Sequence, residues 1–157
     1  MNDIFQLLLT TSFKLAIYFI FLDILAINTN DGNKRAYSID SHGGYEKLDF
    51  YFGYSTEVYS SCSLQWKNNN YVFGGWDEKG QVSMVNGNRL ERKGTLSFDF
   101  SSGGCTVLNQ FTIVLCFDYI EDDVCRQSND PLGSFTKLPN STYSHGETRI
   151  ASFDSKN

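Results

Sequence analysis

The sequence predicts an all-β fold built from antiparallel sheets, and three observations lead to this prediction. A pattern recurs along the chain at an offset of 42 to 43 residues. Short segments rich in β-branched and aromatic residues are separated by regular turn signals. No segment after residue 28 keeps the apolar period of an amphipathic helix.

The repeat relates two consecutive units of the chain. Cys62 aligns with Cys105, and the apolar segment Tyr71-Val72-Phe73 aligns with Ile113-Val114-Leu115. Periods of this length occur in β-propeller blades and in helical arrays, and the β-branched and aromatic composition favours blades. A β-sandwich of the immunoglobulin type is the main alternative, but it would not explain the repeat.

The N-terminal residues 1–27 differ in kind from the rest of the chain. An apolar run from Leu15 to Leu22 follows Lys14 and precedes Ile24-Leu25-Ala26. A positive charge, an apolar stretch and a small residue follow one another in secretory signal peptides. We therefore expect a cleaved signal peptide here, with an uncleaved signal anchor or an ordinary buried segment as alternatives. An anchor would carry Lys14 and Asp23 into the bilayer, at a cost of about 2.5–3.5 kcal/mol each near its centre.

Strands are expected in order after a polar, Gly- and Asn-rich linker at residues 28–47. The polar residues 67–70 indicate a four-residue hairpin turn, and Asn86-Gly87 is typical of a type I′ turn. Leu96 to Phe100 alternates apolar and polar side chains, as a half-buried strand does. The other segments expected to form strands are 48–52, 58–66, 71–73, 81–85, 106–108, 111–117, 124–127 and 134–138.

Four cysteines are present, and no two of them form a C-x-x-C pair. Zinc sites favour close Cys and His pairs, so we expect disulfides formed in an oxidising compartment, with reduced buried thiols as the alternative. Cys116 and Cys125 flank a short segment that a hairpin can close, and we favour this pair. Cys62 and Cys105 then remain, although four cysteines allow three connectivities.

An apolar strand runs into a double glycine at Tyr71-Val72-Phe73-Gly74-Gly75, and this pattern resembles the signature of a kelch repeat. Phe135-Thr136-Lys137-Leu138-Pro139 is similar to the later W-x-x-L-P segment of such a repeat, with Phe in place of Trp. Glycine accepts a positive φ, which suits Gly74 and Gly75 to a tight exit from a strand. The second copy has Cys116-Phe117 at this place, and the resemblance covers about residues 58–153.

The resemblance implies kelch-type β-propeller blades over residues 48–157. Two units would lie at about 62–104 and 105–146, and a truncated third would begin at 147. Propellers have typically 4–8 blades, so this chain would form an incomplete ring and be part of a larger propeller.

Charge and motifs argue against several classes of function. The net charge is −5 and no basic run is longer than Lys34-Arg35, whereas nucleic-acid binding needs a basic stripe. No G-x-S-x-G, H-E-x-x-H or P-loop motif occurs. The two histidines, His42 and His145, stand in separate contexts, so the chain lacks the ligand set of the copper-radical oxidases among kelch propellers. We expect no catalytic residue, no cofactor and no nucleic-acid partner.

Acidic residues cluster in the loop between Cys116 and Cys125. Several carboxylates together can bind calcium, but the D-x-D-x-D-G spacing that would make this specific is missing. We therefore favour a solvated acidic loop without a metal. The cluster consists of Asp118, Glu121, Asp122 and Asp123.

Trp76 is the aromatic residue that we most expect on the surface. It follows the double glycine on the loop Trp76-Asp77-Glu78, and loops of this kind are common contact surfaces. Trp66 and the nine tyrosines could add a binding face for a sugar or a peptide. Strands also use aromatic residues to fill cores, and we favour the core for most of them.

The sequence as a whole favours a secreted, non-catalytic interaction module that binds a protein partner. The sequon Asn140-Ser141-Thr142 is a candidate N-glycosylation site and agrees with export. The membrane would be involved only if the N-terminal segment stays uncleaved. Two alternatives remain open: a fragment of a secreted propeller enzyme, an oxidase or a glycan hydrolase, and a truncated product without a function of its own.

Overall fold

The computed structural model describes residues 15–20, 23–28, 34–40, 42–53, 60–77 and 79–143, with the backbone alone for the first two ranges. These ranges contain thirteen strands and no helix, so nothing described here is a helix able to cross a membrane. The strands are β1 (Leu15–Ile20), β2 (Asp23–Asn28), β3 (Arg35–Ile39), β4 (Tyr45–Leu48), β5 (Tyr51–Phe52), β6 (Cys62–Trp66), β7 (Asn69–Phe73), β8 (Gln81–Asn86), β9 (Arg89–Thr95), β10 (Gly104–Leu108), β11 (Thr112–Cys116), β12 (Cys125–Ser128) and β13 (Thr136–Lys137).

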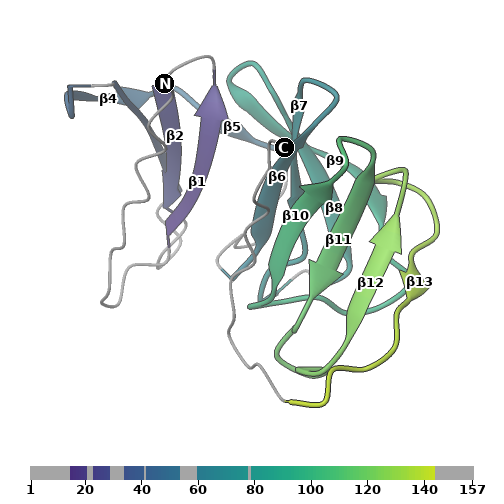
Figure 1. The fold of residues 1–157 in the computed structure, drawn as a ribbon. Helices are drawn as coiled ribbons and strands as arrows, with labels where there is room; N and C mark the ends of the chain where they lie inside the picture. The colour runs from purple at the N-terminus through teal and green to yellow at the C-terminus, as the bar shows by residue number, and fades with distance from the viewer. Residues whose placement is uncertain are drawn as a thin grey trace.

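Three sheets follow one another along the chain (Figure 1). The first has the order β1-β2-β3-β4, the second the order β5-β9-β8-β7-β6, and the third the order β10-β11-β12-β13. Neighbouring strands pair antiparallel throughout, except that β5 lies parallel to β9 at the edge of the second sheet. The prediction of an all-β fold with antiparallel sheets is confirmed.

The first sheet occupies a part of the chain in which the sequence predicts a signal peptide and a polar linker. Strands β1 and β2 lie within residues 1–27, apart from the last residue of β2. Strands β3 and β4 lie within or at the end of residues 28–47 and pair from Ala36 opposite Leu48 to Ile39 opposite Tyr45. Along β3, Ala36 is buried, Arg35 is exposed, and the last three residues are half-buried.

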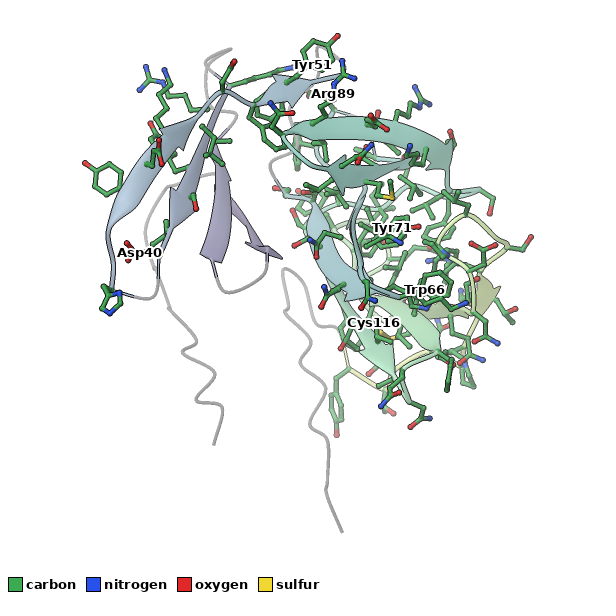
Figure 2. The ribbon with its side chains drawn as sticks, turned by 90° about the horizontal axis from the view of Figure 1, so that it is seen from above. Asp40, Tyr51, Trp66, Tyr71, Arg89 and Cys116 are labelled. Atoms are coloured by element: carbon green, nitrogen blue, oxygen red, sulfur yellow. A yellow bond between two sulfur atoms is a disulfide. The ribbon has the colours of Figure 1, made fainter. Side chains whose placement is uncertain are left out.

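The second sheet is covered on both faces, and alternate residues of β7 contribute to two separate cores. Val72 packs against Ala36 and Leu90, in a cluster shared with the first sheet. Tyr71 and Phe73 point to the opposite face, in a cluster shared with the third sheet. The ring of Trp66 meets that of Tyr71 edge to face, with 6.4 Å between centroids (Figure 2). The third sheet contributes Cys105, Ile113 and Leu115 to this second cluster.

The turns of the second sheet are tighter than the sequence predicts. Lys67 and Asn68 alone join β6 to β7, with φ values of 47° and 64°, and the polar residues 69–70 belong to β7. Two successive positive φ values are the mark of a type I′ turn, whose twist suits the flanking strands. The next turn is Gly87-Asn88 and not the expected Asn86-Gly87, because Asn86 pairs with Arg89. Gly87 is the residue that supplies a positive φ, 56°.

The three sheets meet along the edge strands β1, β6 and β10. Strand β6 contacts both β1 and β10. A disulfide between Cys62 and Cys105 joins β6 to β10, with 5.8 Å between their Cα atoms. From these edge strands the sheets continue in chain order, β1 to β4, β6 to β9 and β10 to β13, while β5 joins the second sheet at its far edge beside β9.

Candidate functional site

Two neighbouring loops form the candidate site, the β7–β8 loop of the second sheet and the β11–β12 loop of the third. Gly74 opens the first loop with a φ of 67°, and Phe117 opens the second with a φ of 60°. The Gly74 amide donates to the Gln81 carbonyl and the Phe117 amide to the Val124 carbonyl, both at 2.8 Å. Gly74 therefore corresponds to Phe117 in backbone conformation and hydrogen bonding. The sequence alignment sets Gly74 against Cys116 instead, one residue earlier.

Two features of the structure require the double glycine: its backbone conformation and the close approach of another backbone segment. Gly74 and Gly75 both have positive φ, 67° and 134°. A Cβ atom on Gly74 would lie 1.8 Å from the Phe100 carbonyl oxygen. Phe117 shows that a side chain can tolerate a similar φ where no backbone atom approaches so closely.

The segment that connects β9 to β10 forms backbone hydrogen bonds with both loops. The Phe100 carbonyl accepts a hydrogen bond from the Gly75 amide at 3.2 Å, and the Phe100 amide donates to the Lys79 carbonyl at 2.8 Å. The next residue, Ser101, accepts a hydrogen bond from the Tyr119 amide at 2.9 Å. Phe100 is itself buried, with 1% of its surface exposed. One buried segment thus fixes the β7–β8 and β11–β12 loops relative to each other.

An exposed aromatic pair lies where these loops meet. Trp76 and Tyr119 each follow the opening residue of their loop by two positions, and their rings meet edge to face with 5.7 Å between centroids. Trp76 is 41% exposed, and Tyr119 and Ile120 are each 57% exposed. We call Trp76, Tyr119 and Ile120 the aromatic patch. The Lys79 ammonium lies 5.9 Å from the centroid of the Trp76 ring.

The acidic loop is less solvated than the sequence predicts. Asp118 is only 2% exposed, so the expectation of a solvated carboxylate is wrong at this position. One of its oxygens accepts hydrogen bonds from the amides of Ile120 at 2.8 Å and Glu121 at 3.0 Å. Its other oxygen lies 3.9 Å from the Arg126 guanidinium. Asp118 therefore shapes the turn that presents Tyr119 and Ile120.

The other carboxylates of this loop also have partners in the chain. Arg126 forms an ion pair with Glu121 and lies over the Phe98 ring, 4.2 Å from its centroid. Asp123 accepts a hydrogen bond from the Asn140 side-chain amide at 2.6 Å. In the part of the chain that the structure describes, no group of three or more His, Cys, Asp or Glu residues is arranged to hold a metal ion.

The remaining residues proposed for a site are dispersed. Asp77 is exposed beside Trp76. Glu78 and His145 lie outside the described residues. His42 lies in the β3–β4 turn, where its amide donates to Asp40 at 2.8 Å. Together with the Gly44 amide, this hydrogen bond lowers the pKa of Asp40 below its ordinary value.

Both expected disulfides are present. Cys116 and Cys125 occupy directly opposite positions of β11 and β12, with 4.0 Å between their Cα atoms. The Cys62–Cys105 bridge joins two sheets and not two strands of one sheet. Because neither pair leaves a cysteine free, the cysteines are structural and not candidates for chemistry.

A second exposed patch lies at the opposite end of the sheets, and few features of the sequence indicate it. The Trp66 indole donates to the Phe111 carbonyl at 3.4 Å, which joins the tips of the β6–β7 and β10–β11 hairpins. Phe111 is 63% exposed and Leu108 is 41% exposed. The Lys67 ammonium covers the Trp66 ring, 3.9 Å from its centroid. These hairpin tips provide a matched control surface for the aromatic patch.

Comparison of the chain with protein-family models and with curated proteins finds no match.

Proposed function

We propose that this chain is an extracellular protein-interaction module built of kelch-type β-propeller blades, and that it acts by binding and not by catalysis. The observation that carries the proposal is the Trp76–Tyr119 pair, which two neighbouring sheets present from corresponding loop positions. Exposed aromatic side chains on rigidly held loops are the kind of residue that dominates binding energy at protein interfaces.

The order of the strands supports the proposal of blades. Four strands of each sheet run in chain order from an inner edge strand, β1, β6 or β10, and β6 contacts both β1 and β10; β5 adds a fifth strand at the far edge of the second sheet. Propeller blades are four-stranded antiparallel sheets arranged radially in this way. The fold by itself does not fix a function, so the proposal of binding rests on the patch and not on the blades.

Two observations support an extracellular location. The disulfides Cys62–Cys105 and Cys116–Cys125 are compatible with an oxidising compartment. Asn140 is exposed, and we keep it as a proposed glycosylation site.

The proposal is tested by measuring binding of the purified protein to a panel of extracellular proteins by surface plasmon resonance. We expect at least one protein to bind, and the double variant W76A/Y119A to bind it at least about tenfold more weakly. The control variant F111A changes an exposed ring at the opposite end of the sheets and should bind normally. Binding that W76A/Y119A leaves intact, or an absence of binding across the panel, would contradict the proposal.

A further inference from the structure

We propose that Asn86 is a site of spontaneous deamidation, and that its conversion to isoaspartate releases β5 from the edge of the second sheet. The inference concerns a covalent modification of the chain itself and is independent of the proposed binding function.

The sequence and the fold single out this asparagine. Asn86 is the only asparagine in the chain that is followed by glycine. It ends β8 and precedes the turn Gly87-Asn88, and both Asn86 and Gly87 are exposed. Glycine has no side chain to hinder attack by its own amide nitrogen. A Cβ atom on Gly87 would meet no atom within 4 Å, so the space beside the turn is open as well.

The reaction needs only these two residues and water. The Gly87 amide nitrogen forms a bond to the carbonyl carbon of the Asn86 side chain, and the bond from that carbon to Nδ2 breaks. Ammonia leaves with the proton that the Gly87 nitrogen gives up, and a cyclic succinimide remains. Water then adds to either carbonyl carbon of the succinimide and opens the ring. Opening at one carbonyl gives aspartate, and opening at the other gives isoaspartate, in which the main chain runs through the former side chain.

The Asn86 side chain is held more loosely than two other asparagine side chains of the fold. Its Nδ2 donates to the Glu91 carboxylate at 3.4 Å, which is longer than an ordinary hydrogen bond. The side-chain amide of Asn88 donates to the Asp49 carbonyl at 3.0 Å, and that of Asn140 donates to a carboxylate at 2.6 Å. Arginine and serine follow these two asparagines, so their neighbours are also bulkier than glycine.

Isoaspartate at position 86 changes the length of the β8–β9 hairpin. It adds one carbon atom, and so a bond of about 1.5 Å, to the main chain before Gly87. Asn86 pairs with Arg89 across the turn, so the added atom enters the short segment between these two paired residues. Gly87 and Asn88 must then move relative to β9.

The turn that moves is also the attachment of β5. The Tyr51 amide donates to the Asn88 carbonyl at 2.8 Å, and the Asn88 side chain donates to the Asp49 carbonyl at 3.0 Å. The Arg89 guanidinium lies over the Tyr51 ring, 5.0 Å from its centroid (Figure 2). Strand β5 has only two residues, so displacement of Asn88 removes much of what holds it. The beginning of β9 would then offer unpaired backbone groups to another molecule.

The test ages the purified full chain at mildly alkaline pH and follows residue 86 by peptide mapping with mass spectrometry. Protein isoaspartate methyltransferase, which modifies isoaspartate and not aspartate, distinguishes the two products. We expect Asn86 to be converted before the other asparagines, with isoaspartate as the main product. Hydrogen exchange at the Tyr51 and Gly53 amides should then rise several-fold, because these amides donate to the Asn88 and Leu90 carbonyls. Light scattering should show concentration-dependent association of the aged protein.

Three variants separate the steps, and circular dichroism checks that each is folded. Gly87→Ala places a methyl group beside the attacking nitrogen and should slow conversion several-fold. Asn86→Gln would have to form a larger ring, so after ageing it should keep the exchange rates of fresh protein. Freshly prepared Asn86→Asp carries the new charge without the longer main chain, and its exchange at Tyr51 and Gly53 should match that of the wild type.

Each part of the inference can fail separately. If Asn86 stays intact in the aged, folded chain, the assignment of the modification site is overturned. If conversion leaves exchange at Tyr51 and Gly53 unchanged, the release of β5 is overturned. An equal rise of exchange in fresh Asn86→Asp would also overturn it, because the charge and not the lengthened main chain would then be the cause.

Discussion

Cys62 and Cys105 are linked by a disulfide that joins β6 to β10, edge strands of two neighbouring sheets, across 43 residues of sequence. The second disulfide, Cys116–Cys125, closes a segment of only nine residues within one sheet. The two bridges therefore constrain the unfolded chain to different extents.

The first prediction is that the longer-range disulfide contributes more stability. Replacing both Cys62 and Cys105 by serine should cost about 4 kcal/mol of the free energy of unfolding in the chain-entropy model. The same change at Cys116 and Cys125 should cost about 2.5 kcal/mol. Urea denaturation of the two double variants measures both values, and an equal or reversed order would contradict the prediction.

The second prediction compares two glycines with similar backbone conformation. Gly74 and Gly87 have φ values of 67° and 56°, but only at Gly74 would a Cβ atom meet a backbone oxygen. Gly87→Ala should cost about 1–2 kcal/mol for the left-handed conformation alone. Gly74→Ala should cost clearly more, because the Phe100 carbonyl must move. Thermal and urea unfolding give the comparison, and similar costs would show that the contact with Phe100 is not rigid.

A third prediction concerns the buried carboxylate of the acidic loop. Asp118→Ala removes the acceptor of two backbone amides and the charge facing Arg126, and we expect a loss of about 3 kcal/mol of unfolding free energy. Asp118→Asn keeps an acceptor oxygen and removes only the charge, so it should cost less. Hydrogen exchange at Tyr119 and Ile120 would show whether the loop has opened, and unchanged exchange in the alanine variant would refute this role.

The fourth prediction is a pH dependence that originates at Tyr71. Burial, followed by the negative charge of Asp130, raises the pKa of the Tyr71 phenol above its ordinary value. The folded state therefore holds this proton more tightly than the unfolded state does. The resulting stability is fully present below pH 10, about the pKa of an unperturbed tyrosine, and is lost as the pH rises through the folded-state pKa. The urea midpoint of the wild type relative to that of Tyr71→Phe should fall as the pH is raised from 8 to 11.5. A relative midpoint that stays constant would contradict the assignment.

The fifth prediction tests the role of the N-terminal residues. Strand β2 pairs with β3 from Ile24 opposite Ile39 to Asn28 opposite Arg35, so removal of residues 1–26 should leave one edge of β3 unpaired. Amides of β3 should then exchange faster with solvent, and Ala36 should lose part of its protection. If the shortened chain kept the stability and exchange pattern of the full chain, the interpretation of residues 1–27 as a removable signal peptide would be favoured.

Local signals were sufficient for several features of the fold. The strands around Tyr71 and Ile113 follow from β-branched and aromatic composition, and the positions of Cys116 and Cys125 follow from a hairpin that brings them together. The exposure of Trp76 agrees with its place after a double glycine. Each of these depends on residues that are close in sequence.

Other features depend on contacts that the sequence does not reveal. Asp118 is buried beside the Arg126 guanidinium, which also lies over the Phe98 ring of another segment. The contact between Tyr119 and Trp76 does not follow from the sequence repeat. The repeat as aligned by sequence sets Trp76 against Asp118, one residue before Tyr119. The signal that would have found it is the shared positive φ of Gly74 and Phe117, which is a property of the backbone and not of residue type.

The short parallel strand β5 has a consequence for the behaviour of the protein in solution. Its two residues lie along β9, with the Tyr51 amide bonded to the Asn88 carbonyl at 2.8 Å and the Arg89 guanidinium over the Tyr51 ring at 5.0 Å (Figure 2). An uncovered sheet edge offers unpaired amides and carbonyls that can recruit a strand from another molecule. Because β5 pairs with Arg89 and Leu90, the chain itself covers the beginning of the β9 edge and protects that part of the second sheet against edge-to-edge aggregation.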